Sequence, residues 1–145
     1  MRKVSRSALV PYTAAQMYGL VKDVESYPSF LPWCADAVVH IRDPEFIEAS
    51  LELHRRGISK RFRTRNVLTE DEALGIELVD GPFRHMSGGW TFHQLGEMGC
   101  KVSLELEFEF ESRATDLILG HFFEKTCNAL VNSFTERASS MFAKA

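Results

Sequence analysis

The chain has 145 residues, of which 45% are hydrophobic and 26% are charged, and its formal net charge is −3 at pH 7. This length suits one domain with a sizeable core, and the composition excludes disordered and fibrous proteins. The small negative charge excludes a general attraction of the whole surface to nucleic acid.

Cysteine usage and hydropathy indicate the compartment. Cys34, Cys100 and Cys127 are odd in number and too widely spaced for a disulfide framework or a CxxC zinc site. We expect them to be buried, reduced thiols. No opening signal peptide is evident, and no apolar run approaches the roughly 20 residues of a membrane span. The sequence predicts a cytoplasmic protein, with any contact at the inner membrane peripheral.

The first predicted elements are a strand over 3–10 and a helix over 13–23. Thr13 is placed to cap the helix, and apolar side chains follow at helical spacing. Residues 23–34, "DVESYPSFLPWC", contain two prolines, each of which fixes its own φ and moves the preceding residue away from the α region. This segment cannot be a regular helix or strand, although it is rich in apolar side chains.

Residues 35–111 are predicted to form antiparallel strands. In residues 100–111, "CKVSLELEFEFE", apolar and polar side chains alternate, which is typical of a strand with one buried and one solvated face. The chain offers turn signals between the strands at Asp43-Pro44, Arg56-Gly57, Gly81-Pro82 and 97–99.

The turn at Arg56-Gly57 predicts a register. A two-residue loop pairs residues whose numbers sum to 113, which places Glu52 opposite Arg61 and Glu48 opposite Arg65 on one face. The other face then carries four side chains that point to the concave side of the sheet. Three of them are polar and need partners, either water at an open strand end or the polar head of a ligand. The four are Lys60, Phe62, Thr64 and Asn66.

The same hairpin is rich in basic residues. A positive stripe on one face is typical of an RNA-contacting surface, whereas the glutamates opposite favour a solvated sheet face. In this register Arg63 lies opposite Ser50, so it and the turn arginines have no predicted carboxylate partner. The candidates for an RNA contact are Arg55, Arg56, Arg61, Arg63 and Arg65.

After Ser112 the apolar period becomes helical and continues over nearly 30 positions. We expect one long amphipathic helix that crosses the apolar face of a curved sheet of about seven strands, an α+β fold with space for a cavity between the layers. Plain core packing and a ligand cavity need the same residue types at these positions. The predicted interior consists of Phe62, Trp90, Phe92, Leu106, Phe108, Phe123, Leu130 and Phe134.

Catalytic and metal-binding motifs are absent from the sequence. It contains no HExxH, glycine-rich phosphate loop, GxSxG elbow or metal-spaced His/Cys cluster, and its histidines are scattered. We therefore expect no enzyme activity, no metal and no required cofactor.

Several segments together carry a resemblance that covers nearly the whole chain. "YPSFLPWC" and "DGPFRHMSGGWTF", with "GISKRFRTRN" and "LVNSFTERA", resemble the coenzyme Q-binding and polyketide cyclase-like branch of the START superfamily, with the nearest match among bacterial ribosome association toxins. Residues 111–120, "ESRATDLILG", depart from the family pattern before the last helix.

The resemblance implies a single START-like domain over 1–145 with a helix-grip fold. Segment 23–34 then lies near the cavity mouth, where Phe30, Leu31 and Trp33 are either inward plugs or a lip that touches membrane or ligand. The family motifs correspond to Tyr27, Pro28, Phe30, Leu31, Pro32 and Trp33, and to Gly81, Pro82, Phe83 and Trp90.

Three functional hypotheses follow. The first is non-enzymatic binding of ubiquinone or a related isoprenoid lipid in support of respiratory electron transport. The second is a toxin that binds the large ribosomal subunit through the arginines and blocks subunit association. The third, a polyketide aromatase/cyclase, is based on fold analogy alone. The expected ligand site consists of Phe30, Leu31, Trp33, Lys60, Phe62, Thr64, Asn66, Trp90, Phe92, Leu106, Phe108, Phe123, Leu130 and Phe134.

Overall fold

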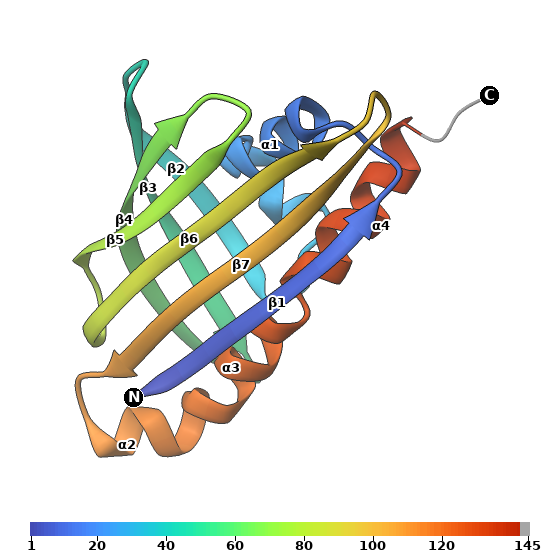
Figure 1. Ribbon diagram of the computed structural model, residues 1–145. Helices are drawn as coiled ribbons and strands as arrows, with labels where there is room; N and C mark the ends of the chain where they lie inside the picture. Colours follow the sequence, from blue (N-terminus) through green and yellow to red (C-terminus); the bar gives the residue numbers. More distant parts are fainter. Residues whose placement is uncertain (143–145) are drawn as a thin grey trace.

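A computed structural model describes residues 1–142 and contains one seven-stranded antiparallel sheet in the order β1-β7-β6-β5-β4-β3-β2 (Figure 1). Every neighbouring pair of strands is consecutive in sequence except β1 and β7. In chain order the elements are β1 (Arg2–Val10), α1 (Ala14–Lys22), η1 (Val24–Ser29), β2 (Cys34–Arg42), β3 (Phe46–Arg55), β4 (Ile58–Thr69), β5 (Ala73–Asp80), β6 (Phe83–Leu95), β7 (Gly99–Phe110), α2 (Arg113–Thr115), η2 (Asp116–Gly120), α3 (His121–Asn128) and α4 (Leu130–Phe142).

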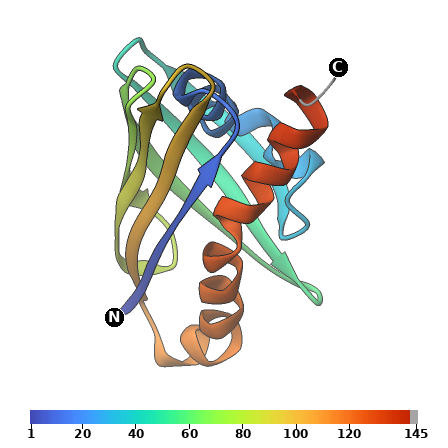
Figure 2. The ribbon, with the colours of Figure 1, turned by 45° about the vertical axis from the view of Figure 1, so that its right-hand side comes forward.

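The sheet is curved, and the C-terminal helices lie along its concave side (Figure 2). α3 and α4 contribute the buried side chains of Phe123, Cys127, Val131, Phe134 and Ala138 to the core. α1 contacts α4 and strands β5, β6 and β7 at one end of the sheet. The predicted α+β helix-grip architecture is therefore confirmed.

The predicted cap of the first helix is also confirmed. The Thr13 hydroxyl accepts a hydrogen bond from the Gln16 backbone N–H at 3.1 Å, and the Thr13 N–H donates to the Gln16 side chain at 2.9 Å. This capping box satisfies two N–H groups that would otherwise have no partner at the helix start. It directs the inner face of α1, with the fully buried Met17 and Val21, onto the sheet.

The proline-containing segment after α1 forms η1, a short 3₁₀ helix with Pro28 inside it. Its apolar side chains pack inward. The Tyr27 hydroxyl donates to the backbone carbonyl of Val21, the Tyr27 ring lies 5.4 Å from that of Phe134, and Leu31 is 1% exposed. Burial raises the pKa of the Tyr27 hydroxyl, which keeps it protonated as a donor.

The predicted hairpin register between β3 and β4 is confirmed, since every pair from Phe46↔Val67 to Arg55↔Ile58 sums to 113. Glu52 lies 2.9 Å from Arg61, and Glu48 lies 2.9 Å from Arg65. The expectation that Arg63 has no carboxylate partner is wrong, because its guanidinium lies 2.8 Å from Glu48. Arg63 reaches diagonally across the pair, so one carboxylate bridges two arginines.

The prediction of one continuous C-terminal helix is wrong in two places. Residues 116–120 form a π-helical turn, which contains more residues than an α-helical turn and so displaces Leu117 and Ile118 outward, to 78% and 57% exposure. The helix also breaks at Ala129, whose N–H is shared between the carbonyls of Lys125 and Thr126. The break separates α3 from α4, visible as a bend in Figure 2.

Arg2 connects the edge strand β1 to the start of the helical region. Its guanidinium lies 2.9 Å from Asp116 and 2.7 Å from Glu124. Gly120 leaves room for this contact, because a Cβ there would lie 2.7 Å from an Arg2 nitrogen. The hydrogen bond from Arg2 lowers the pKa of Asp116, and its two carboxylate partners raise the pKa of Arg2.

We expect Arg2→Gln to reduce the free energy of unfolding by up to about 1 kcal/mol at pH 7, since the pair is partly exposed. The pKa of Asp116 is lower in the folded than in the unfolded state. Its contribution is therefore complete above the unfolded value of about 3.9 and is lost as the pH falls through the folded value. Urea unfolding at several pH values checks this, with the exposed neighbour Lys3→Gln as control. A difference between wild type and Arg2→Gln that persists undiminished at pH 2 would instead assign the loss to packing.

Candidate functional site

An apolar cavity of about 70 Å³ lies between the concave face of the sheet and helices α3 and α4. Strands β3 to β7, the segment around η1, and helices α3 and α4 all contribute to its wall. The lining residues are Tyr27, Trp33, Leu51, Phe62, Thr64, Asn66, Leu74, Ile76, Met86, Trp90, Leu106, Phe123, Cys127, Leu130 and Phe134.

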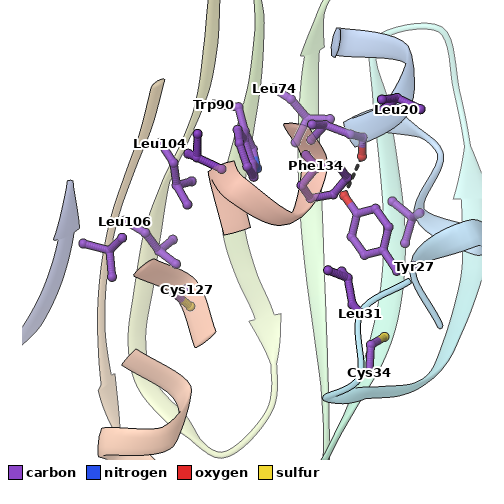
Figure 3. Close-up of a cluster of buried hydrophobic side chains, with 14 of the residues drawn as sticks. Leu20, Tyr27, Leu31, Cys34, Leu74, Trp90, Leu104, Leu106, Cys127 and Phe134 are labelled. Carbon is purple, nitrogen blue, oxygen red and sulfur yellow. Dashed lines mark hydrogen bonds between the residues drawn. The ribbon is translucent and has the colours of Figure 1, made fainter. Parts of the chain in front are cut away.

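Figure 3 shows how part of this wall is assembled. Phe134 of α4 lies between Trp90 of β6 and Tyr27 of η1, with ring centroids 5.2 Å and 5.4 Å away. Leu106 of β7 and Cys127 of α3 lie on the side of Trp90 away from Tyr27. The segment with the two prolines therefore helps to close the cavity.

Nine of the residues predicted from the sequence line the cavity, and their role in binding stays a prediction. They come from the segment after η1, from β4, β6 and β7, and from α3 and α4. The nine are Trp33, Phe62, Thr64, Asn66, Trp90, Leu106, Phe123, Leu130 and Phe134.

The other five predicted residues lie outside the lining. Lys60 is exposed, although Leu53 directly opposite it on β3 is buried. Leu31 and Phe108 are fully buried core residues, and Phe108 packs 4.9 Å from Phe123. Phe30 packs against Phe134 and Tyr27, and Phe92 packs against Tyr18 of α1.

Six lining residues were not predicted. Leu51 belongs to the confirmed hairpin register, which turns it toward Phe62. For β5 and β6 the sequence offers no comparable register, so it did not predict which of their side chains point to the concave side. The six are Tyr27, Leu51, Leu74, Ile76, Met86 and Cys127.

Thr64 and Asn66 are the polar pair of the cavity wall. Both are buried, and the Thr64 hydroxyl donates to the side-chain oxygen of Asn66 at 3.0 Å. This arrangement leaves the Asn66 amide nitrogen as a donor for a ligand carbonyl. Elsewhere the wall is mainly apolar, so the cavity suits a hydrophobic molecule with one polar group.

The cavity is small. A volume of 70 Å³ holds a few water molecules, whereas pockets for drug-sized ligands measure about 300–1,000 Å³. A ring-containing ligand therefore requires part of the wall to move.

Trp33 is a wall residue that the cavity shares with a groove on the outside of the protein. It is 9% exposed, lies edge-to-face with Phe123 at 6.3 Å, and contributes to both the inner cavity and an outer groove. It thus faces inward as a plug, one of the two orientations expected from the sequence. The outer groove has a volume of about 520 Å³ and is lined by Pro32, Trp33, Arg55, Arg56, His121, Phe122, Lys125, Thr126, Ala129 and Ser133.

The arginines predicted as a nucleic-acid surface divide into two groups. Arg61 is 2.9 Å from both Asp36 and Glu52, and Arg63 and Arg65 are bound by Glu48. Arg65 and, less strongly, Arg63 hold the pKa of Glu48 below its usual range. The remaining two, Arg55 and Arg56, lie at the hairpin tip in the outer groove.

The cysteines are free and buried, as expected. Burial raises the pKa of Cys34 to about 11 and also raises the pKa of Cys127, which disfavours the reactive thiolate at both positions.

Within residues 1–142 no group of three His, Cys, Asp or Glu side chains is arranged to hold a metal ion. None of the helices in the described part of the chain is long and apolar enough to cross a membrane.

Comparisons with known proteins agree with this fold. The family model described as polyketide cyclase / dehydrase and lipid transport matches residues 10–135. A Vibrio cholerae protein named ribosome association toxin RatA is 44% identical over 144 residues, which cover 99% of this chain and 100% of that protein. A Dictyostelium discoideum protein named coenzyme Q-binding protein COQ10, mitochondrial, is 25% identical over 135 residues, which cover 90% of this chain and 66% of that protein.

Solved structures give the same architecture. The crystal structure of the Zhui aromatase/cyclase from Streptomyces superimposes with a TM-score of 0.83, covering 99% of this chain and 98% of that one. Its sequence identity is 17%, so the likeness concerns the fold alone.

Proposed function

Since this chain belongs to the START-like polyketide cyclase / dehydrase and lipid transport family, with a relative named ribosome association toxin at 44% identity, we propose that it binds the large ribosomal subunit and blocks subunit association. The observation that carries the proposal is the extent of this match. It covers the whole of the relative and 99% of this chain. The basic groove at the hairpin tip supplies a surface suited to such a partner.

Reassociation of purified ribosomal subunits tests the proposal. Free subunits are mixed with increasing amounts of the protein, the Mg²⁺ concentration is raised, and light scattering follows the formation of assembled ribosomes. We expect the protein to reduce the amplitude when it is added before Mg²⁺, and sucrose gradients to show it in the large-subunit fraction. Unchanged association together with absence from that fraction would refute the proposal. An equal amount of serum albumin is the control for nonspecific effects.

Binding of a hydrophobic ligand, with ubiquinone or a related isoprenoid lipid as the candidate, is the second proposed function. The observation that favours it is the buried Thr64–Asn66 pair in an otherwise largely apolar cavity. The family description includes lipid transport, and a relative at 25% identity is named as a coenzyme Q-binding protein. Burial of an isoprenoid tail contributes about 0.8 kcal/mol per CH₂ group, which can offset opening of the closed cavity. A role in respiration rests on this second proposal.

Thermal unfolding with added short-chain ubiquinone tests the second function. We expect the ligand to raise the melting temperature of the wild type, and Asn66→Leu to remove most of that increase because the polar head loses its donor. Asn132→Leu, at an exposed position of α4, is the matched control and should retain the full increase. Absence of any increase, together with no quinone or lipid in organic extracts of the purified protein, would refute this function.

Both proposed functions are non-enzymatic. No carboxylate or histidine lines the cavity, and the Tyr27 hydroxyl is held by the Val21 carbonyl, so the described wall offers no acid and base pair for cyclisation. Polyketide cyclisation is supported by the fold alone. The continuous sheet from Arg2 to Phe110 supports our proposal that residues 1–145 form a single domain. Cytoplasmic location and inner-membrane contact stay predictions.

A further inference from the structure

The groove on the outer side of α3 collects basic side chains from two elements. Arg55 and Arg56 come from the tip of the β3–β4 hairpin, and His121 and Lys125 come from α3. Arg56, His121 and Lys125 are exposed, and Arg55 is half-buried. The hairpin tip and the helix are therefore arranged so that their cationic groups share one concave surface.

These groups are not neutralised within the described chain. Among residues 1–142, no carboxylate lies within 4.0 Å of the charged groups of Arg55, Arg56 or Lys125. The acidic side chains on the nearby helical turns, Asp116 and Glu124, are both bound by Arg2. The groove thus keeps an excess positive charge although the whole chain has a net charge of −3.

Local structure fixes the backbone of Arg56 and the side chain of Arg55. Arg56 and Gly57 have φ values of 48° and 80°, which is the left-handed pair of a tight two-residue hairpin turn. The Arg55 guanidinium lies 4.4 Å from the centroid of the Phe122 ring, a cation–π contact that orients it. A guanidinium fixed in this way loses less conformational entropy when it binds a phosphate, and its planar donors match phosphate geometry.

We propose that this groove, rather than the convex face of the sheet, binds the phosphate backbone of ribosomal RNA. The inference rests on the proposed ribosome association and identifies its contact surface. Charge complementarity carries it, because the groove offers unpaired cations while Arg61, Arg63 and Arg65 on the sheet are already bound to carboxylates. A concave, cation-lined groove of about 520 Å³ accepts a strand, whereas a flat membrane surface would contact only its rim.

The salt dependence of binding separates this surface from others. Each phosphate contact contributes a slope of about −0.7 to −0.9 to the plot of log K against log salt concentration. Removal of two phosphate contacts should therefore make the slope less steep by about 1.4–1.8. A contact that depends on shape or apolar area would not change the slope.

The test uses a double variant, Arg56→Gln with Lys125→Gln, because both side chains are exposed. Arg55 is left unchanged because it packs on Phe122. Co-sedimentation with large subunits at 50, 100 and 200 mM monovalent salt gives the affinities. We expect the double variant to bind at least about 10-fold more weakly at low salt, with the smaller slope. The control with the same change in net charge is Lys3→Gln with Lys101→Gln, at exposed positions on β1 and β7, and it should bind like the wild type.

The outcomes are distinguishable. If the wild type binds large subunits and the groove variant binds with equal affinity and slope, the inference is overturned and the proposed function stands. If the wild type does not bind, both fail. Vesicles of phosphatidylglycerol and phosphatidylethanolamine provide the remaining comparison. Vesicle binding that needs Arg56 and Lys125 while ribosome binding does not would assign the groove to a membrane and overturn the inference.

Discussion

Replacing Phe123 with alanine is expected to reduce the free energy of unfolding by about 3–5 kcal/mol. The Phe123 ring is 3% exposed and lies at the centre of an aromatic cluster. Its centroid is 4.9–6.3 Å from those of five neighbours on the exit of η1 and on strands β4, β6 and β7: Trp33, Phe62, Phe83, Phe108 and Phe110. The sheet and α3 cannot both collapse onto the vacated space, so most of the lost contact is not recovered.

Urea unfolding of Phe123→Ala and Phe122→Ala provides a matched comparison on one helix. Phe122 is half-buried and faces Arg55 in the outer groove, so its loss should cost considerably less. Because Phe123 also lines the cavity, its replacement should enlarge that space and increase binding of a small apolar probe such as benzene. Equal destabilisation by the two variants would contradict the central position given to Phe123.

Replacing Gly88 with alanine is expected to destabilise the protein by at least about 3 kcal/mol or to prevent folding. Gly88 of β6 has φ 146°, a conformation that L side chains rarely adopt. A Cβ on Gly88 would overlap the backbone carbonyl oxygen of Glu105 on β7 and lie 2.8 Å from the Leu106 Cα. Backbone strain and steric overlap therefore act together, and relief requires separation of β6 from β7.

The control for Gly88→Ala is Gly75→Ala in β5. A Cβ on Gly75 would lie 3.6 Å from the Val67 Cβ, an ordinary van der Waals contact, and its φ is not positive. We expect Gly75→Ala to be neutral or slightly stabilising, since alanine reduces the conformational freedom of the unfolded chain. Thermal unfolding of both proteins, or the soluble yield of a variant that does not fold, checks the contrast. Similar melting temperatures for the two variants would show that β6 and β7 adjust without cost.

The β3–β4 register could be predicted because two independent signals agreed. The Arg56-Gly57 turn fixes the pairing sum, and a shift by one residue would have separated Glu52 from Arg61 and moved Phe62 off the core face. Arg63 was assigned wrongly because only residues directly opposite were considered. The reach of a long side chain to a diagonal carboxylate depends on sheet twist, which pairing arithmetic does not contain.

The helix break and much of the cavity wall could not be predicted, for a common reason. An apolar spacing of three or four residues is compatible with α, π and kinked helices, so Ala129 gave no signal in the pattern. Leu74 and Met86 become wall residues because the sheet curves around Phe134, and curvature accumulates over all seven strands. Lys60 shows the converse, since its pairing with Leu53 was predicted correctly but its side chain is exposed and lies outside the lining.

The position of Trp33 gives the two proposed functions a common thermodynamic consequence. Its indole belongs to the wall of the cavity and to the wall of the basic groove. A ligand that enlarges the cavity by moving this ring outward also reshapes the groove, so the two binding equilibria are linked. Linkage is reciprocal. If an apolar ligand changes the affinity of the protein for the ribosome by some factor, the ribosome changes the affinity for that ligand by the same factor. The lipid-loaded and ribosome-bound proteins are then alternative or mutually reinforcing states of one molecule, according to the sign of that factor.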